Sequence, residues 1–152
     1  PLFRDLIAKG ADGLPITDER MTRFWITLNQ GVQFVLSCLS LTRGGEIFVP
    51  KIPSMRMVDL AKAMAPQLPH KVVGIRPGEK LHEVMVTEDD SRFTVELADR
   101  YVIEPSFHWW KRRSFADDGA VRVADGFRYA SDTNTQWLDV DGLNRMLRES
   151  GL

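Results

Sequence analysis

Two short segments of the sequence each place an arginine beside a break in regular structure. Residues 16–27 contain Arg23, and residues 74–83 contain Arg76. A planar guanidinium held at such a break can form paired hydrogen bonds with a phosphate group. Neither segment contains a catalytic apparatus. The two segments therefore predict a part of a protein that binds a phosphorylated substrate, separate from the part that performs the chemistry.

Each arginine also has a structural interpretation. Arg23 precedes two aromatic residues that could hold its stem, but it could instead pair with a carboxylate such as Asp18. Arg76 follows a predicted strand that ends at Ile75 and precedes a Pro-Gly turn. Ligands of α/β sheets usually bind beyond the carboxyl ends of strands. The alternative for Arg76 is an exposed loop arginine.

Three neighbouring residues could complete a ligand site. Glu79 could accept hydrogen bonds from sugar hydroxyls or could buttress Arg76, and Thr17 could bond a ligand or only the local turn. Met21 could flank a base or sugar, or belong to the core. Lys80 and His82 have weaker claims, because a histidine beside a turn is more often structural than catalytic.

The elements that must position these residues follow from hydrophobic spacing. Residues 2–7 show helical spacing that stops at Gly10, and residues 14–18 predict a short extended piece. Thr27 and Gln30 form a capping-box signature, which predicts that a helix begins there. The apolar stripe of this helix comprises Leu28, Val32, Val35, Leu36 and Leu39.

The next region alternates strand and helix. Residues 46–49 predict a strand closed by Pro50, and residues 71–75 predict another. Between them, Ser54 is a candidate N-cap for a helix that ends near Pro66. The order helix, strand, helix, strand between residues 27 and 76 predicts an α/β fold.

The last third is less regular. Residues 93–97 alternate as in a half-buried strand, and residues 101–103 are either its hairpin partner or a separate strand. Residues 104–126 show no clear periodicity and predict a loop that a partner could order. Apolar residues at 143, 146 and 147 predict a short final helix that stops at Gly151.

Composition excludes several classes of function. The 152 residues fit one domain, and a net charge of -1 gives no global attraction to nucleic acid or to an anionic membrane. No apolar stretch approaches the length needed to span a bilayer. The lone Cys38 fits a reducing, cytoplasmic compartment.

One basic and aromatic segment resembles a nucleic-acid patch. Residues 109–113 interleave tryptophan with lysine and arginine, as surfaces that bind single-stranded nucleic acid do. Two aspartates follow at 117 and 118, so we favour a surface or oligomer-contact loop. An RNA-binding module built on this segment is the alternative.

Several catalytic signatures are missing from the sequence. It has no Gly-x-Gly-x-x-Gly turn for a dinucleotide, no nucleophile elbow and no residue grouping with metal-ligand spacing. Neither tyrosine is followed by a lysine four positions later. The chain begins with Pro1 inside a predicted helix, which is the pattern expected of a fragment of a longer chain.

Three long motifs carry a family resemblance. They read ITDERMTRFWIT at residues 16–27, GGEIFVPKIPSM at 44–55 and GIRPGEKLHE at 74–83. In this order they resemble the inverting UDP-N-acetylglucosamine 4,6-dehydratases, which are extended short-chain dehydrogenase/reductases. The resemblance is weakest over residues 104–126 and returns at 129–131 and 136–138.

The resemblance implies a reaction on bound NADP. Hydride leaves C4 of the sugar, water is eliminated across C5 and C6, and hydride returns to C6 while C5 inverts. The UDP-linked 6-deoxy-4-keto product begins pseudaminic acid synthesis for bacterial surface and flagellar glycans. The family's cofactor turn and catalytic residues lie in an N-terminal Rossmann portion and match nothing here. Residues 1–152 would thus be the C-terminal substrate-binding part, expected to be inactive alone.

The resemblance also implies roles for the singled-out residues. Arg23 and Arg76 would hold the UDP diphosphate and its ribose side, while Thr17, Met21 and Glu79 would line the nucleotide-sugar pocket. The expected partners are UDP-N-acetylglucosamine, the missing Rossmann portion and further copies of the chain in a homo-oligomer. A stand-alone nucleotide-sugar binding module and a membrane-anchored polysaccharide-biosynthesis dehydratase are the alternatives.

Overall fold

A computed structural model of the chain describes residues 2–107 and 110–151. Its α-helices are α1 (Leu2–Ala8), α2 (Leu28–Leu41), α3 (Met57–Met64) and α4 (Val140–Glu149), and its 3₁₀ turns are η1 (Asp90–Phe93) and η2 (Ala116–Asp118). Its strands are β1 (Leu14–Ile16), β2 (Thr22–Phe24), β3 (Ile47–Pro50), β4 (Ser54–Arg56), β5 (His70–Val72), β6 (Val84–Val86), β7 (Thr94–Glu96), β8 (Arg100–Ile103), β9 (Val121–Arg122) and β10 (Tyr129–Ala130).

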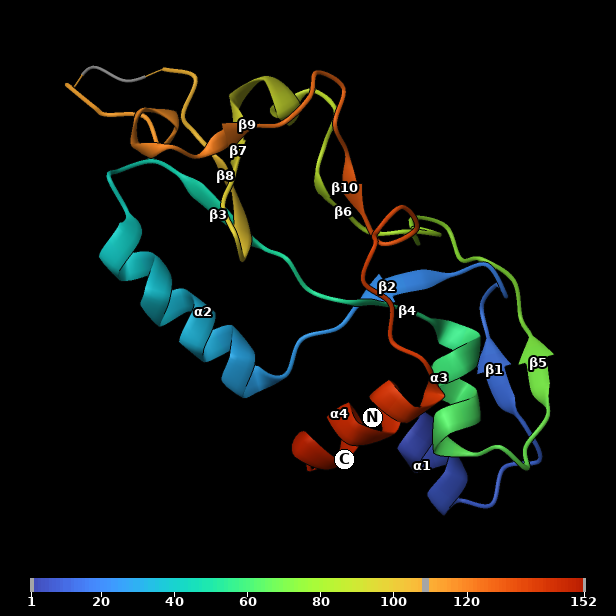
Figure 1. Cartoon of the computed structure of the whole chain (residues 1–152). Helices are drawn as coiled ribbons and strands as arrows, with labels where there is room; N and C mark the ends of the chain where they lie inside the picture. The colour runs from blue at the N-terminus through green and yellow to red at the C-terminus, as the bar shows by residue number, and fades with distance from the viewer. Residues whose placement is uncertain (1, 108–109, 152) are drawn as a thin grey trace.

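The strands form several small sheets rather than one large one. β1 pairs with β5 in parallel, whereas β2–β4 and β6–β10 are antiparallel pairs. A four-stranded antiparallel sheet has the order β3-β8-β7-β9. Figure 1 shows α1, α3 and α4 gathered around β1 and β5 at one end of the molecule, and the four-stranded sheet at the other. The fold is mixed α/β, as predicted.

The largest core lies at the helical end. It joins α1, α3 and α4 to β1 and β4 through apolar side chains that are 8% exposed or less. Leu14 and Leu143 are fully buried there. Asp139 caps α4 by accepting a 2.7 Å hydrogen bond from the Gly142 amide, which fixes where this helix begins. The buried residues of the cluster are Phe3, Leu14, Ile16, Met55, Leu60, Ala61, Ala65, Leu143 and Leu147.

Helix α2 begins where the sequence predicts, but its apolar stripe is not covered. The Gln30 amide donates to Thr27 Oγ1, and the Thr27 amide donates to Gln30 Oε1, so the capping box is confirmed. None of the residues of α2 is buried, and Leu28 is 86% exposed. Figure 1 shows the helix standing apart from α1, α3 and α4.

Arg100 attaches α2 to the four-stranded sheet. Its side chain is 5% exposed, pairs with Asp99 and donates to Ser37 Oγ at 2.8 Å and to Cys38 Sγ at 3.2 Å. The guanidinium also lies 4.6 Å from the centre of the Phe34 ring. One side of α2 therefore contacts the sheet through polar and cation–π interactions, while the apolar stripe is left exposed among the described residues.

Two local predictions are wrong. Ser54 does not cap a helix, because it is the first residue of β4 and its Oγ accepts a hydrogen bond from Asn134 Nδ2 at 3.0 Å. α3 begins later, after Arg56, with no side-chain cap. The predicted strand at 71–75 ends at Val72, and β5 and β3 belong to different sheets. Pairing with strands distant in the sequence, β4 with β2 and β5 with β1, determines the conformation of both segments.

Residues 104–107 and 110–126 are more ordered than predicted, and contacts within the described chain order them. The segment includes η2 and β9, and β9 extends the sheet by pairing with β7. Phe115 is 3% exposed and packs in a core cluster with Val95 and Val102. Tyr101 and Val102 also confirm the hairpin interpretation, because β8 pairs antiparallel with β7.

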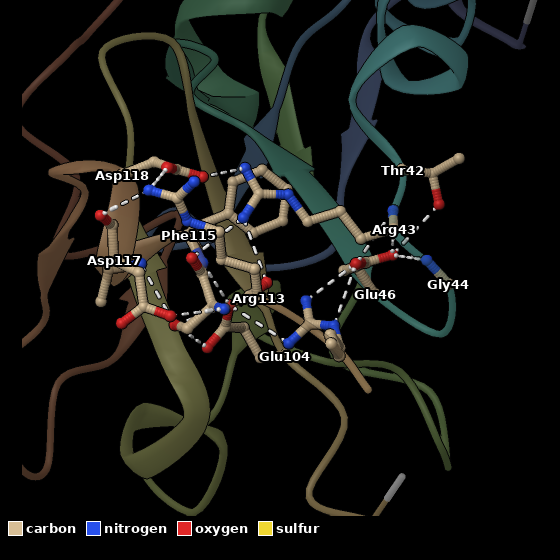
Figure 2. Close-up of polar contacts among 12 residues, drawn as sticks. Thr42, Arg43, Gly44, Glu46, Glu104, Arg113, Phe115, Asp117 and Asp118 are labelled. Carbon is tan, nitrogen blue, oxygen red and sulfur yellow. Dashed lines mark hydrogen bonds and ion pairs between the residues drawn. The ribbon is translucent and has the colours of Figure 1, made fainter. Parts of the chain in front are cut away.

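A buried ion-pair cluster fixes this segment (Figure 2). Arg112 contacts Glu46 at 2.8 Å and Glu104 at 3.3 Å, and the three side chains are 4%, 0% and 9% exposed. The predicted surface loop is therefore wrong for Arg112, whereas Arg113 is 67% exposed. Trp109 lies outside the described residues. A buried, paired Arg112 also counts against the RNA-binding alternative.

The same cluster sets the ionisation of Glu46. Burial by itself raises the pKa of this carboxyl, but the hydrogen bond from Arg112 opposes that effect. Further hydrogen bonds from the Thr42 hydroxyl and the Arg43 amide add to it, and the net pKa is below its usual value. Glu46 is thus charged at neutral pH and joins the residues that follow α2 to Arg112.

Removing the arginine from this cluster tests its importance. We expect Arg112→Met to lower the free energy of unfolding by about 3–5 kcal/mol, because it leaves two carboxylates buried without their counter-charge. The matched control is Arg113→Met, which removes an exposed ion pair with Asp118 and should cost less than about 1 kcal/mol. Chemical denaturation measures both. Equal effects of the two variants would contradict the buried cluster.

Candidate functional site

A cleft of about 220 Å³ lies at the junction of β1, β5 and β2. All five residues singled out in the sequence line this cleft. Six further residues complete its wall and are largely apolar. The full lining is Leu2, Phe3, Pro15, Ile16, Thr17, Met21, Arg23, Met57, Val73, Arg76 and Glu79.

The parallel pairing of β1 with β5 brings the two halves of the site together. Ile16 pairs with Val72, and the Val73 amide donates to the Ile16 carbonyl at 2.9 Å. Because the strands are parallel, their carboxyl ends meet at one edge. Thr17 leaves β1 at this edge, and the chain that leads to Arg76 leaves β5 beside it. Ligands of α/β proteins bind at edges of this kind.

A tight turn presents Arg76 and Glu79. The Glu79 amide donates to the Arg76 carbonyl at 3.0 Å, and Gly78 has a φ of 81°. Proline followed by a residue with positive φ is the pattern of a type II turn, which only glycine adopts without strain. The turn holds the side chains of Arg76 and Glu79 on one stretch of chain above the strand ends.

Glu79 bridges the two strand ends. Its carboxylate accepts a hydrogen bond from the Thr17 hydroxyl at 3.4 Å and another from the Arg76 amide at 3.3 Å. Glu79 therefore buttresses Arg76 through the backbone and not through the guanidinium. The Arg76 side chain is exposed and makes no hydrogen bond or ion pair within residues 2–107 and 110–151. Its guanidinium is available to a ligand.

Arg23 is placed differently, because its donors are already used. Nη1 donates to the carbonyls of Thr22 at 2.7 Å and Leu81 at 3.1 Å, and Nη2 donates to Lys80 at 2.8 Å. Nε lies 3.4 Å from Glu83 Oε1. A guanidinium has five N–H donors, so about one is left for a ligand. Arg23 mainly clamps residues 80–83 to β2.

The proposed structural partner of Arg23 is wrong. Asp18 pairs with Arg20 at 2.8 Å instead, and it also accepts the Arg20 amide at 2.8 Å. The side-chain hydrogen bond from Arg20, together with the one from its amide, lowers the pKa of Asp18 to about 2. The Met21 amide donates to the Asp18 carbonyl, which turns the buried Met21 side chain into the wall of the cleft.

The apolar wall was not predicted from the sequence as part of a site. The sequence predicts a helix for Leu2 and Phe3, and it places Met57 within the helix expected to end near Pro66. Their role depends on packing between α1, α3 and β1, which no local pattern encodes. Among the described residues no cluster of histidine, cysteine and carboxylates could hold a metal ion. None of the helices in that part of the chain is long and apolar enough to cross a membrane.

The comparison with known families fits this arrangement. Residues 1–105 match the family described as "Polysaccharide biosynthesis protein", and the chain belongs to that family. The inverting UDP-N-acetylglucosamine 4,6-dehydratase of Campylobacter jejuni is 53% identical over 142 residues, which are 90% of this chain and 42% of the relative. The resemblance read from the three motifs is thereby confirmed.

Two less similar proteins also match nearly all of this chain with less than half of their own length. A UDP-glucose 4-epimerase from Rickettsia canadensis is 32% identical over 97% of this chain and 44% of its own length. The X-ray structure of Pen from Bacillus thuringiensis superposes with a TM-score of 0.77 at 28% identity, covering 99% of this chain and 44% of that one. The chain thus spans less than half the length of these proteins.

The clamp formed by Arg23 predicts a stability effect. We expect Arg23→Ala to lower the free energy of unfolding by about 1–3 kcal/mol, because the carbonyls of residues 80 and 81 lose their donor. Arg20→Ala is the matched control; its side chain is 73% exposed, so its loss of stability should be clearly smaller than that of Arg23→Ala. Thermal or chemical denaturation distinguishes the two. A larger loss for Arg20→Ala would refute the clamp.

The Asp18–Arg20 pair predicts a titration. Because the folded pKa of Asp18 is depressed from 3.8 to about 2, its contribution to stability is present above pH 3.8 and is lost as the pH falls through about 2. Arg20→Ala removes the side-chain hydrogen bond, so the pKa of Asp18 should rise toward 3.8. Carboxyl carbon shifts followed by NMR measure it. An unchanged Asp18 titration in Arg20→Ala would rule out the pairing.

Proposed function

We propose that this chain is the nucleotide-sugar-binding part of an inverting UDP-N-acetylglucosamine 4,6-dehydratase. One observation carries the proposal: Thr17, Met21, Arg23, Arg76 and Glu79 line a single cleft, at the edge where two parallel strands end. The names of the relatives support a UDP-sugar as the ligand, since both a dehydratase and an epimerase of UDP-sugars match most of the chain.

The chemistry of the cleft supports binding rather than bond breaking. Arg76 offers the free guanidinium that a diphosphate recognises through charge-assisted hydrogen bonds. Glu79 and Thr17 offer an acceptor and a hydroxyl for the ribose or the sugar, and the apolar wall around Met21 suits a flat base. Arg23 contributes mainly by holding the segment that follows Arg76. Binding energy from the remote UDP group would orient the sugar for reaction elsewhere.

The cofactor implied by the resemblance is not accommodated by these residues. A dinucleotide site needs glycines where a strand passes into a helix. The glycines that precede the cleft's arginine and glutamate, Gly74 and Gly78, lie instead in an exposed turn with positive φ. We therefore assign NADP to a Rossmann portion N-terminal to this chain. The complete enzyme would be a bacterial cytoplasmic protein making a 6-deoxy-4-keto sugar for pseudaminic acid and flagellin glycosylation.

The uncovered stripe on α2 supports this missing portion as a partner. Amphipathic helices normally bury their apolar face, and a contiguous exposed one marks an interaction surface. On α2, Leu28 is 86% exposed, Val35 is 59% exposed and Leu39 is 68% exposed. We propose that the Rossmann portion covers this stripe, and that the complete protein assembles as a homo-oligomer.

Substitution of Arg76 in the full-length protein tests the function. We expect Arg76→Ala to weaken binding of UDP by about tenfold or more, because a fixed charged contact to the diphosphate is lost. Isothermal titration with UDP and with UDP-N-acetylglucosamine measures this. The proposed reaction adds a second readout, which is formation of the 4-keto product with NADP bound.

The matched control is Lys80→Met in the same segment. Lys80 is exposed and is not among the residues lining the cleft, although its backbone carbonyl accepts from Arg23. Its side chain should therefore be dispensable for UDP affinity. If Arg76→Ala bound UDP as tightly as Lys80→Met does, the cleft would not be the diphosphate site.

A further inference from the structure

The side chains of Thr22, His82 and Ser131, from distant parts of the sequence, form a hydrogen-bond network beside the cleft. Thr22 Oγ1 lies 2.8 Å from His82 Nδ1 and 2.7 Å from Ser131 Oγ. The Glu83 amide donates to Ser131 Oγ at 2.9 Å. Thr22 is 4% exposed and Ser131 is fully buried, so each hydroxyl hydrogen must find its acceptor within the protein.

The direction of these hydrogen bonds follows from counting hydrogens. Within the described part of the chain, Ser131 Oγ has no partner except Thr22 and the Glu83 amide. If Thr22 donated to Ser131, the Ser131 hydrogen would have no acceptor, at a cost of about 1–3 kcal/mol. Ser131 therefore donates to Thr22.

The assignment extends to the histidine. Because Thr22 Oγ1 accepts from Ser131, its own hydrogen is donated to His82 Nδ1. A ring nitrogen that accepts a hydrogen bond carries no proton. The network thus selects the neutral imidazole of His82 with its proton on Nε2, which is how tautomers are assigned from hydrogen bonding.

The hydrogen-bond network ends at residues 81–83, which follow the turn at residues 76–79. Leu81 accepts from the Thr22 amide at 3.1 Å, and the Ser131 amide donates to the Glu83 carbonyl at 2.8 Å. His82 lies between these two backbone contacts, and the turn at residues 76–79 ends three residues before it. The position of His82 therefore limits where Arg76 and Glu79 can lie.

We propose that His82, as the neutral tautomer protonated on Nε2, is a positioning residue for UDP binding. It holds residues 76–79 at the edge of β1 and β5 by accepting the hydrogen bond from Thr22. This inference rests on the proposed function, because it concerns the same cleft. The role requires a hydrogen-bond acceptor at Nδ1 of His82, so a side chain of similar size without an acceptor should not replace it.

The tautomer is tested without any ligand. In the full-length protein labelled with ¹⁵N at histidine, ring-nitrogen shifts should show His82 with Nδ1 unprotonated and the proton on Nε2. The resonance is assigned by its loss in His82→Asn. Thr22→Val, which keeps the shape of the side chain but removes the hydroxyl, should release this preference, whereas Thr22→Ser should retain it. A proton on His82 Nδ1 in the wild-type protein would overturn the proposal.

The positioning role is tested by two substitutions at His82. Asparagine retains an acceptor near the place of Nδ1, and leucine fills a similar volume without one. We expect His82→Leu to raise the dissociation constant of UDP and the KM for UDP-N-acetylglucosamine by about tenfold, with little change in kcat. His82→Asn should recover most of the loss, which a purely space-filling role would not allow.

The outcomes separate this inference from the proposed function. If the wild type binds UDP and both His82 variants lose affinity equally, the positioning role is overturned and the function stands. If the wild type does not bind UDP, the proposed function fails and the positioning role fails with it, whatever the tautomer. Recovery by asparagine, together with an unprotonated Nδ1, would establish the role of His82.

Discussion

The hydrogen bonds between β2 and residues 80–83 are the constraint on which the cleft depends. The turn at 76–79 is exposed, and apart from its bonds to Thr17 and to its own backbone it has little to fix it. Its orientation is set at both ends. β5 holds the beginning through parallel pairing with β1, and Arg23 holds the end by donating to two backbone carbonyls. Arg76, which we propose to bind the ligand, is left unpaired among the described residues, whereas the donors of Arg23 are used by nearby backbone carbonyls.

The two arginines differ in how well the sequence predicts their surroundings. The position of Arg76 is predicted by local signals, a strand end followed by proline and glycine, and the side chain does line the cleft. Arg23 was recognised as important from its place beside aromatic residues, but its partners lie 57 and 58 positions away. No local pattern identifies a backbone carbonyl at that separation, and the nearby Asp18 was the natural but wrong candidate.

The separation of contacting residues along the chain also explains which other structural predictions are confirmed and which are wrong. The capping box of α2 and the hairpin of β7 and β8 involve neighbouring residues and were predicted. Ser54 has the preference of an N-cap, yet strand pairing and Asn134 determine its conformation. Arg112 belongs to a segment without periodicity, and its buried partner Glu46 lies 66 positions away. The amphipathic character of α2 was predicted, but what covers it is not within the described residues.

The hydrogen bond between Thr22 and Ser131 joins positions 109 residues apart. Contacts of such separation require closure of a long loop, and folding slows as they come to dominate a structure. The helices and the β7–β8 hairpin can form from neighbouring residues, whereas this bond cannot exist until the chain has been synthesised beyond residue 131. During translation, the residues that line the cleft, which lie between positions 2 and 79, would therefore be present well before Thr22 acquires this partner.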